Sequence, residues 1–265
     1  MRDQAAGLRA RAAARAAVVD ASPGGREILV VASGKGGVGK STLAILLARV
    51  LACGERRVLL FDGTLNQGNL HILLGARPAR RLDALLAGEA VPRQLLVPVC
   101  ERLWLLPADS GAETVQALTA MDRARLHHRL SGLYEDFDCV VVDCGAGVEG
   151  PVRAATLGAT RLLVVTVPEP AALSDAYALI KMVSLQVPTL PVHVIVNRVA
   201  SASEAGAAFE RLRIAAERFL QRSISFLGAV PEDPALRRAV CVPGGLLAVA
   251  PSAIETLVAG LPAHA

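Results

Sequence analysis

The stretch that most limits how this chain can fold is Gly34-Lys-Gly-Gly-Val-Gly-Lys-Ser41. An apolar run, Ile28-Leu-Val-Val31, precedes it, and an apolar helical pattern over 40–53 follows it. The spacing matches G-x-x-x-x-G-K-[ST], whose glycines let backbone N–H groups approach phosphate oxygens at the start of a helix. We therefore expect a phosphate-binding loop with Lys40 at the β- and γ-phosphates, Ser41 on Mg²⁺ and Thr42 beside the α-phosphate.

The rest of the chain alternates short β-branched runs with helical patterns. Strands are predicted at 27–32, 57–62, 102–106, 138–143, 161–167, 191–197 and 225–230, and helices at 40–53, 80–87, 121–134, 151–158, 171–186, 202–221, 233–240 and 251–260. Continuous apolar runs are typical of strands covered on both faces. The pattern predicts one doubly wound α/β domain over 26–265, with a mostly parallel sheet and helices on both faces, after a short helical arm at 1–25.

Two aspartates are predicted at the carboxyl ends of strands, where ligands bind in such a fold. Asp143 follows the run 139–142 and suits a magnesium site, although an Asp at a strand end also caps helices. Asp62 ends the strand 57–62, and Thr64 stands where we expect a further carboxylate to position an attacking water. A hydroxyl is uncharged and a poor base near neutral pH, so we expect nucleotide binding to survive better than turnover.

The composition narrows the chemistry further. Among 28 Lys and Arg residues only Lys35, Lys40 and Lys181 are lysines, and two of them lie in the glycine loop, where a compact ammonium charge is needed. The net charge of +4 is modest and suggests no nucleic-acid binding by itself. The five scattered cysteines predict reduced, mostly buried thiols in a cytoplasmic protein, and no apolar stretch reaches the roughly 18 to 20 residues of a membrane span. No secretory signal is recognised at the N-terminus.

Four motifs in order carry a resemblance to a known family. Lys35-Gly-Gly-Val-Gly-Lys-Ser-Thr42 resembles the deviant phosphate loop of the MinD/ParA ATPases, and Asp143-Cys-Gly-Ala-Gly147, Asn197-Arg198 and Gly228-Ala-Val-Pro231 resemble later family motifs. The resemblance implies an ATP-sandwiched dimer in which Lys35 reaches the partner's nucleotide, with Lys35, Lys40 and Asp62 in catalytic roles and Ser41, Asp62 and Asp143 at Mg²⁺. It also implies a nucleotide site made of Gly34, Lys35, Gly36, Gly37, Val38, Gly39, Lys40, Ser41, Thr42, Asn197, Arg198 and Pro231.

The N-terminal arm narrows the resemblance to one branch. Asp3-Gln-Ala-Ala-Gly-Leu-Arg9 is similar to the D-Q-A-x-x-L-R motif of FlhG, also called FleN, the MinD-like regulators of flagellar number and placement. This implies that Gln4 stimulates GTP hydrolysis by an FlhF-like GTPase, while Asp3, Leu8 and Arg9 dock the arm. It also implies contacts with flagellar basal-body or transcription regulators, and a place at the membrane near the cell pole. Alternatively, the arm is an ordinary Ala/Arg terminus.

Two departures from the family pattern keep alternatives open. Thr64 replaces a family Asp. The sequence is therefore compatible with a weak ATPase and, alternatively, with a regulator that binds a nucleotide without hydrolysing it. Residues 252–265 contain no Lys or Arg, which puts membrane attachment in doubt. A third alternative, DNA binding in the manner of ParA, would need the arginines of one predicted helix, Arg211, Arg213, Arg218 and Arg222, with Arg218 and Arg222 on one face.

Overall fold

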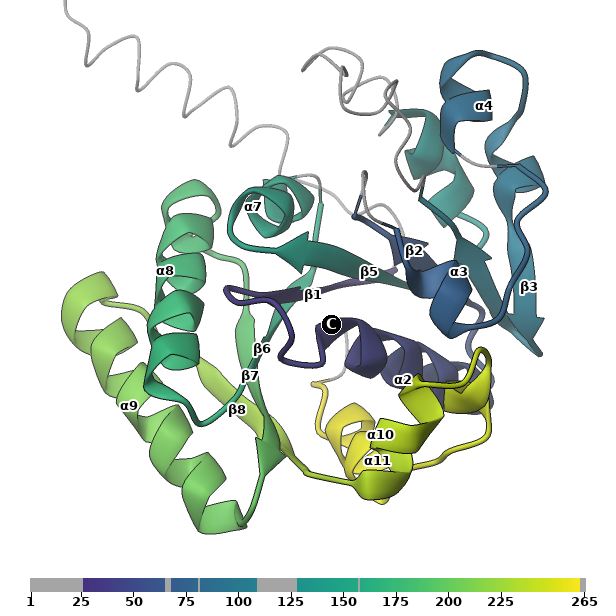
Figure 1. Ribbon diagram of the computed structural model, residues 1–265. Coiled ribbons are helices and arrows are strands. Elements are labelled where there is room, and N and C mark those ends of the chain that lie inside the picture. The colour runs from purple at the N-terminus through teal and green to yellow at the C-terminus, as the bar shows by residue number, and fades with distance from the viewer. Residues whose placement is uncertain (1–25, 65–67, 81, 109–127, 157, 263–265) are drawn as a thin grey trace, which may run out of the picture.

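An eight-stranded sheet forms the centre of the molecule (Figure 1). The computed structural model describes residues 26–64, 68–80, 82–108, 128–156 and 158–262, so the arm at 1–25 lies outside the described residues. The strands lie in the order β3-β4-β2-β5-β1-β6-β7-β8, and all neighbours are parallel except β3 and β4. Their bounds are β1 Glu27–Ser33, β2 Val58–Asp62, β3 Val97–Cys100, β4 Leu103–Leu106, β5 Cys139–Ala146, β6 Arg161–Thr166, β7 Val192–Val199 and β8 Ser225–Pro231.

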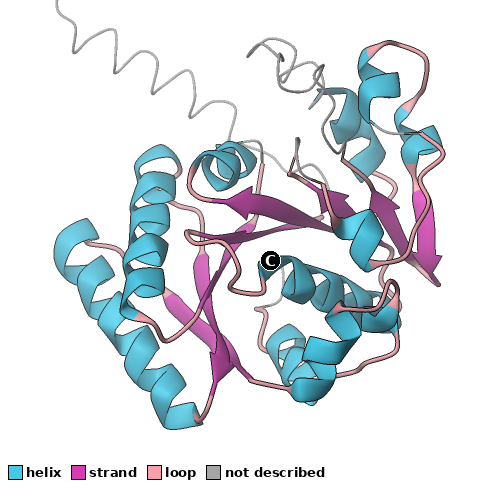
Figure 2. Cartoon of the chain, in the orientation of Figure 1, coloured by secondary structure: helices cyan, strands magenta, loops and turns pink. Residues whose placement is uncertain are grey.

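Helices cover both faces of this sheet (Figure 2). They are α2 Lys40–Cys53, α3 Leu70–Leu73, α4 Leu82–Leu86, α7 Glu149–Thr156, α8 Pro170–Gln186, α9 Ala202–Leu220, α10 Pro234–Val240 and α11 Ser252–Ala259, with 3₁₀ turns at Pro92–Leu95 and Gly245–Leu247. Figure 1 shows α7, α8 and α9 on one face and α2, α10 and α11 on the other. The predicted doubly wound α/β fold is confirmed.

The core explains why the apolar runs are continuous. All six residues of β6 are buried, and successive side chains enter opposite layers: Leu162 packs with α8 and α9, whereas Leu163 packs with α2 and α11. A strand covered on both faces needs apolar side chains along its centre, here Leu162 to Val165, because neither side meets water. The two layers therefore hold the sheet rigid beneath the loops at its carboxyl edge.

Several predicted boundaries are wrong. β5 continues to Ala146, past the expected end, and β3 was not predicted at all because Pro98 interrupts its pattern. Proline lacks the N–H of a central strand but is tolerated at a sheet edge, where β3 lies. The short α3 was also missed. For the helix predicted at 121–134, only residues 128–134 are described, and they are helical.

The expectation of mostly buried cysteines is also wrong. All five thiols are free, but only Cys139 and Cys144 are buried, and both lie in β5. Cys53, Cys100 and Cys241 are exposed, because they lie at or beyond the ends of their elements rather than in the apolar interior. Burial raises the pKa of Cys139 and of Cys144 to about 12, so both thiols stay protonated near neutral pH.

Candidate functional site

The glycine loop connects the end of β1 to the start of α2. Gly39 caps α2 with a φ of 90°, a left-handed conformation that favours glycine, and its carbonyl accepts a hydrogen bond from the Leu43 N–H at 3.0 Å. Gly34 is needed for another reason: a Cβ atom there would lie 2.2 Å from the Asp175 carbonyl oxygen on α8. The loop is thus packed against α8 while its N–H groups gather at the N-terminus of α2, a suitable place for an anion.

A buried ion pair lies beneath the loop. Lys40 Nζ donates to Asp143 Oδ1 at 2.5 Å and to Ser41 Oγ at 3.2 Å. Burial raises the pKa of Asp143, while the Lys40 ammonium and the hydrogen bond with Ser41 oppose that rise. The sequence placed these three residues in one site, and the structure brings them together.

Asp143 also has an oxygen available for a ligand. Its Oδ2 atom is buried and makes no hydrogen bond within the described part of the chain. A buried carboxylate oxygen without a donor is costly, and a cation or a cation-bound water would satisfy it. The described residues include no group of three His, Cys, Asp or Glu that could hold a metal alone. Mg²⁺ beside phosphates needs only one or two carboxylates, so Ser41 and Asp143 suit this ion.

Asp62 lies beside Asp143, because the two residues are register partners on β2 and β5. Its side chain is fully buried and accepts hydrogen bonds from the N–H groups of Thr64 and Leu70, each at 3.1 Å. Burial raises the pKa of Asp62 to about 6, helped by the Asp143 charge and opposed by those hydrogen bonds and by Lys40. The carboxylate is therefore held by two backbone N–H groups beside Asp143, at an electrostatic cost.

Thr64 follows directly in the same loop. Its backbone N–H is used by Asp62, and its side chain faces Gly145: a Cβ atom placed on that glycine would lie 3.9 Å from Thr64 Oγ1. The segment after β2 and the segment at the end of β5 therefore meet. The side chain that reaches this meeting point is a hydroxyl and carries no charge.

The predicted base-binding residues lie on β7 and β8. Asn197 is buried, and its Nδ2 atom donates to the Val38 carbonyl in the glycine loop at 2.8 Å. Arg198 is exposed with a φ of 55°, a strained conformation for a residue other than glycine. Pro231 ends β8 and pairs with Val199. Asn197 is thus tied directly to the loop, which its sequence motif alone did not indicate.

Lys35 makes a contact that the sequence did not reveal. Its Nζ atom donates to Glu169 Oε2 at 2.8 Å, and the hydrogen bond and charge of Lys35 hold the pKa of Glu169 below its usual range. Glu169 directly precedes α8, far away in sequence. The only available signal was the Pro168-Glu-Pro170 string, which gives no hint of a lysine partner.

The arginine-rich helix face expected for DNA binding is not formed as predicted. α9 ends at Leu220 and Gln221 turns with a φ of 51°, so Arg222 leaves the helix and does not share a face with Arg218. Arg213 is paired with Glu210 and Glu217, at 2.6 Å each. These carboxylates neutralise part of the helix, which disfavours binding to a polyanion.

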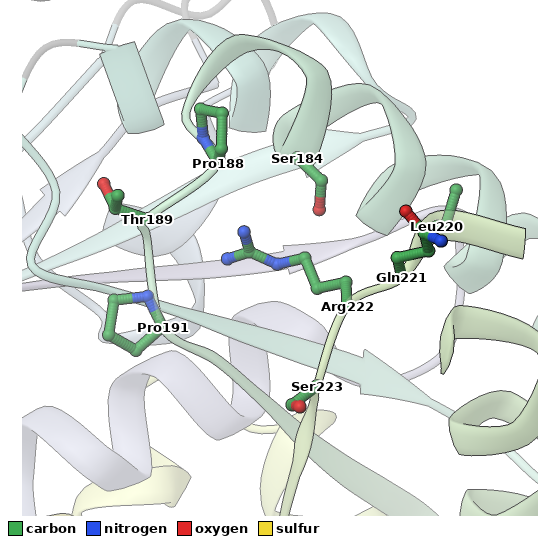
Figure 3. Close-up of a pocket in the computed structure, with 8 residues that line it drawn as sticks. All are labelled: Ser184, Pro188, Thr189, Pro191, Leu220, Gln221, Arg222 and Ser223. Atoms are coloured by element: carbon green, nitrogen blue, oxygen red, sulfur yellow. The ribbon is translucent and has the colours of Figure 1, made fainter. Parts of the chain in front are cut away.

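A surface pocket of about 390 Å³ lies at the opposite edge of the sheet, where α8 and α9 end. Its lining residues are Ser184, Pro188, Thr189, Pro191, Leu220, Gln221, Arg222 and Ser223. Figure 3 shows Arg222 reaching across it, and its guanidinium donates to the Leu190 carbonyl. The pocket is separate from the phosphate loop because its residues lie where α8 and α9 end and β7 and β8 begin. A cation near a helix C-terminus stabilises the fold, which is a sufficient role for Arg222.

The proposed arm residues Asp3, Gln4, Leu8 and Arg9 lie outside the described residues. At the other end, α11 carries Ile254 and Leu257 in the core, so this apolar helix packs against the body. Within the described ranges, no helix has both the length and the apolar content that crossing a membrane requires.

Comparison with known proteins identifies relatives over most of the chain. The profile of the CobQ/CobB/MinD/ParA nucleotide binding domain matches residues 29–242. The antiactivator FleN of Pseudomonas aeruginosa is 33% identical over 81% of this chain and 76% of its own length. The flagellum site-determining protein YlxH of Helicobacter pylori is 31% identical over 82% and 74%, respectively.

The solved structures that resemble this chain belong to the same kind of protein. The cell-division ATPase MinD of Pyrococcus furiosus is 27% identical with a TM-score of 0.71, over 89% of this chain and 98% of its own. MinD of Pyrococcus horikoshii, solved as a complex with Mg-ADP, is 26% identical with a TM-score of 0.69, over 88% and 94%. The chain therefore belongs to the CobQ/CobB/MinD/ParA nucleotide-binding domain family, as its glycine loop predicts.

Proposed function

We propose that this chain is an ATP-binding switch of the MinD type that acts as an FlhG/FleN-like regulator of flagellar number and placement. The observation that carries the proposal is the Lys40–Asp143 pair beneath the glycine loop, at 2.5 Å, with Asp143 Oδ2 left without a donor in the described chain. The similarity to FleN and YlxH supports the flagellar part.

In this proposal each group at the site has a role toward Mg-ATP. The N–H groups of residues 34–39 and the Lys40 ammonium bind phosphate oxygens, and Thr42 lies beside the α-phosphate. Ser41 and Asp143 hold Mg²⁺, with Asp62 beside them; the ion offsets phosphate charge when it is bound. Asn197, Arg198 and Pro231 border the base. When a phosphate oxygen replaces Asp143 as the partner of the Lys40 ammonium, the Asp143 carboxylate becomes available to the cation.

Hydrolysis is proposed to be weak because Thr64 supplies no negative charge at the water position. A regulator that binds ATP without hydrolysing it is the second candidate, and the same residue favours it. Single-turnover hydrolysis with Mg²⁺ separates the two, with Lys40→Ala as the inactive control. Turnover in the wild type that Lys40→Ala abolishes supports the weak enzyme, and the absence of any turnover supports the non-hydrolysing regulator. If Thr64 limits the site, Thr64→Asp increases the rate.

The arm is proposed to act on a second protein. Gln4 would orient the attacking water in an FlhF-like GTPase, because a carboxamide both donates and accepts hydrogen bonds, while Asp3, Leu8 and Arg9 hold the arm in place. A peptide of residues 1–20 should stimulate GTP hydrolysis by the cognate GTPase, and the Gln4→Ala peptide should not. Equal rates with both peptides would remove the flagellar assignment while leaving the nucleotide site untouched.

A further inference from the structure

Lys35 and Glu169 form an ion pair at the mouth of the glycine loop. The Lys35 Nζ and Glu169 Oε2 atoms are 2.8 Å apart, although the two side chains are 41% and 61% exposed. Exposed pairs are often incidental, since two long side chains must be ordered to form them. This pair is more than incidental if the backbone segments that carry Lys35 and Glu169 are both fixed in position.

The backbone on both sides of the pair is held in place. Gly34 packs so closely on α8 that a Cβ atom there would lie 2.2 Å from the Asp175 carbonyl oxygen. Ser33 Oγ donates to the Lys35 carbonyl at 3.0 Å. Glu169 is extended at the start of α8, with Pro170 fixing the first helical position. The lysine and the carboxylate are therefore presented to each other by rigid segments, and only their side chains must be ordered.

A second cation acts on the same carboxylate. Arg198, from the loop after Asn197, also lowers the pKa of Glu169, though less than Lys35 does. Glu169 therefore lies within the electrostatic reach of the phosphate loop and of the proposed base-binding loop.

We propose that Glu169 is a positioning residue that holds the Lys35 ammonium on its own subunit until ATP-bound chains associate. This inference rests on the proposed function together with the ATP-sandwiched dimer that the family resemblance implies, in which Lys35 reaches the nucleotide of a second copy. In this proposal the Lys35 side chain gives up its 2.8 Å contact with Glu169, which is on its own subunit, when it extends across an interface to a phosphate. The Glu169 carboxylate and the phosphates bound by the second copy thus compete for the Lys35 ammonium. A neutral side chain at position 169 weakens the contact on the lysine's own subunit.

The chain's three lysines make the holding contact directly measurable. Lys181 is exposed, Lys35 is half-buried with an accessible side chain, and Lys40 is buried. Amine acylation followed by mass spectrometry therefore measures the modification of Lys35, with Lys181 as an internal reference. In the nucleotide-free chain, Glu169→Gln should raise Lys35 acylation by about two- to fivefold at low salt, the range expected of an exposed pair, with less effect at about 0.5 M salt. Glu210→Gln, which alters an exposed pair on α9, should leave Lys35 acylation unchanged. Equal Lys35 acylation in Glu169→Gln and the wild type would overturn the proposal.

The competition is measured by sedimentation with Mg-ATP. Glu169→Gln should strengthen ATP-dependent association by about two- to fivefold and leave ADP binding by the monomer unchanged. In a Lys35→Ala background the same substitution should have no effect. A wild type that dimerises with ATP while Glu169→Gln associates equally or more weakly would overturn the competition. A wild type that stays monomeric with ATP would overturn the proposed dimer, and the competition with it, whereas acylation still decides whether Glu169 holds Lys35.

Discussion

Replacing Asp62 with Asn should stabilise the nucleotide-free chain while damaging its proposed function. The pKa of Asp62 rises from 3.8 to about 6, mainly because the carboxyl is buried. A rise of about 2 units corresponds to about 3 kcal/mol of penalty on the charged form. Because the folded chain binds this proton more tightly than the unfolded chain, the penalty grows from pH 3.8 to about 6 and stays constant above.

Asn avoids the penalty but loses part of the hydrogen bonding. Asp62 accepts from two backbone N–H groups through its two oxygens, and Asn has only one acceptor oxygen. The N–H group left without an acceptor costs about 1 to 2 kcal/mol. The net expectation at pH 8 is therefore a gain of about 1 to 2 kcal/mol in the free energy of unfolding.

Urea unfolding without nucleotide or Mg²⁺, at pH 5 and pH 8, measures this directly. The advantage of Asp62→Asn over the wild type should be larger at pH 8 than at pH 5 by about 1.4 kcal/mol, the value of one pKa unit. Asp136→Asn is the control, because Asp136 lies in an exposed ion pair with Arg93 and should give a small loss. An Asp62→Asn chain that is less stable than the wild type at pH 8, with no pH dependence in the difference, would refute the reasoning.

Three further substitutions test how the site is supported. Gly34→Ala should lower the free energy of unfolding by about 1 to 3 kcal/mol, because its Cβ would collide with the Asp175 carbonyl; urea unfolding measures it, and a neutral result would contradict the close packing. Asn197→Ala should cost about 1 to 3 kcal/mol by leaving the Val38 carbonyl without its donor, and nucleotide affinity by calorimetry should fall with it. Ser201→Ala removes the side-chain cap of α9 and should cost about 1 kcal/mol in thermal unfolding while nucleotide affinity stays unchanged.

The sequence predicted the site best where one short segment carries both the structure and the chemistry. The glycine loop could be recognised because a strand, a left-handed turn and a helix follow each other directly, and Lys40 then pairs with Asp143 inside the neighbouring strand β5. Glu169 could not be predicted, since its contact with Lys35 depends on how α8 packs against the loop. The position of Arg222 was predicted wrongly for a similar reason. The helical spacing in the sequence continues to Arg222, whereas α9 ends at Leu220 with Gln221 as its C-cap.

The edge of the sheet shows the same limit. Pro98 made the segment 97–100 unlike a strand, yet an edge strand needs hydrogen bonds on only one side. The exposure of three cysteines at the ends of helices and strands was not predicted. Burial depends on which elements pack against a residue, and the sequence gives only the type of its side chain.

Calorimetric binding of Mg-ATP to the full chain, compared with Lys40→Ala, tests the central claim most directly. We predict saturable one-site binding to the wild type that weakens when Mg²⁺ is removed and is lost in a folded Lys40→Ala chain. A wild-type chain that binds no ATP, or a Lys40→Ala chain that binds it with unchanged affinity, would contradict the account.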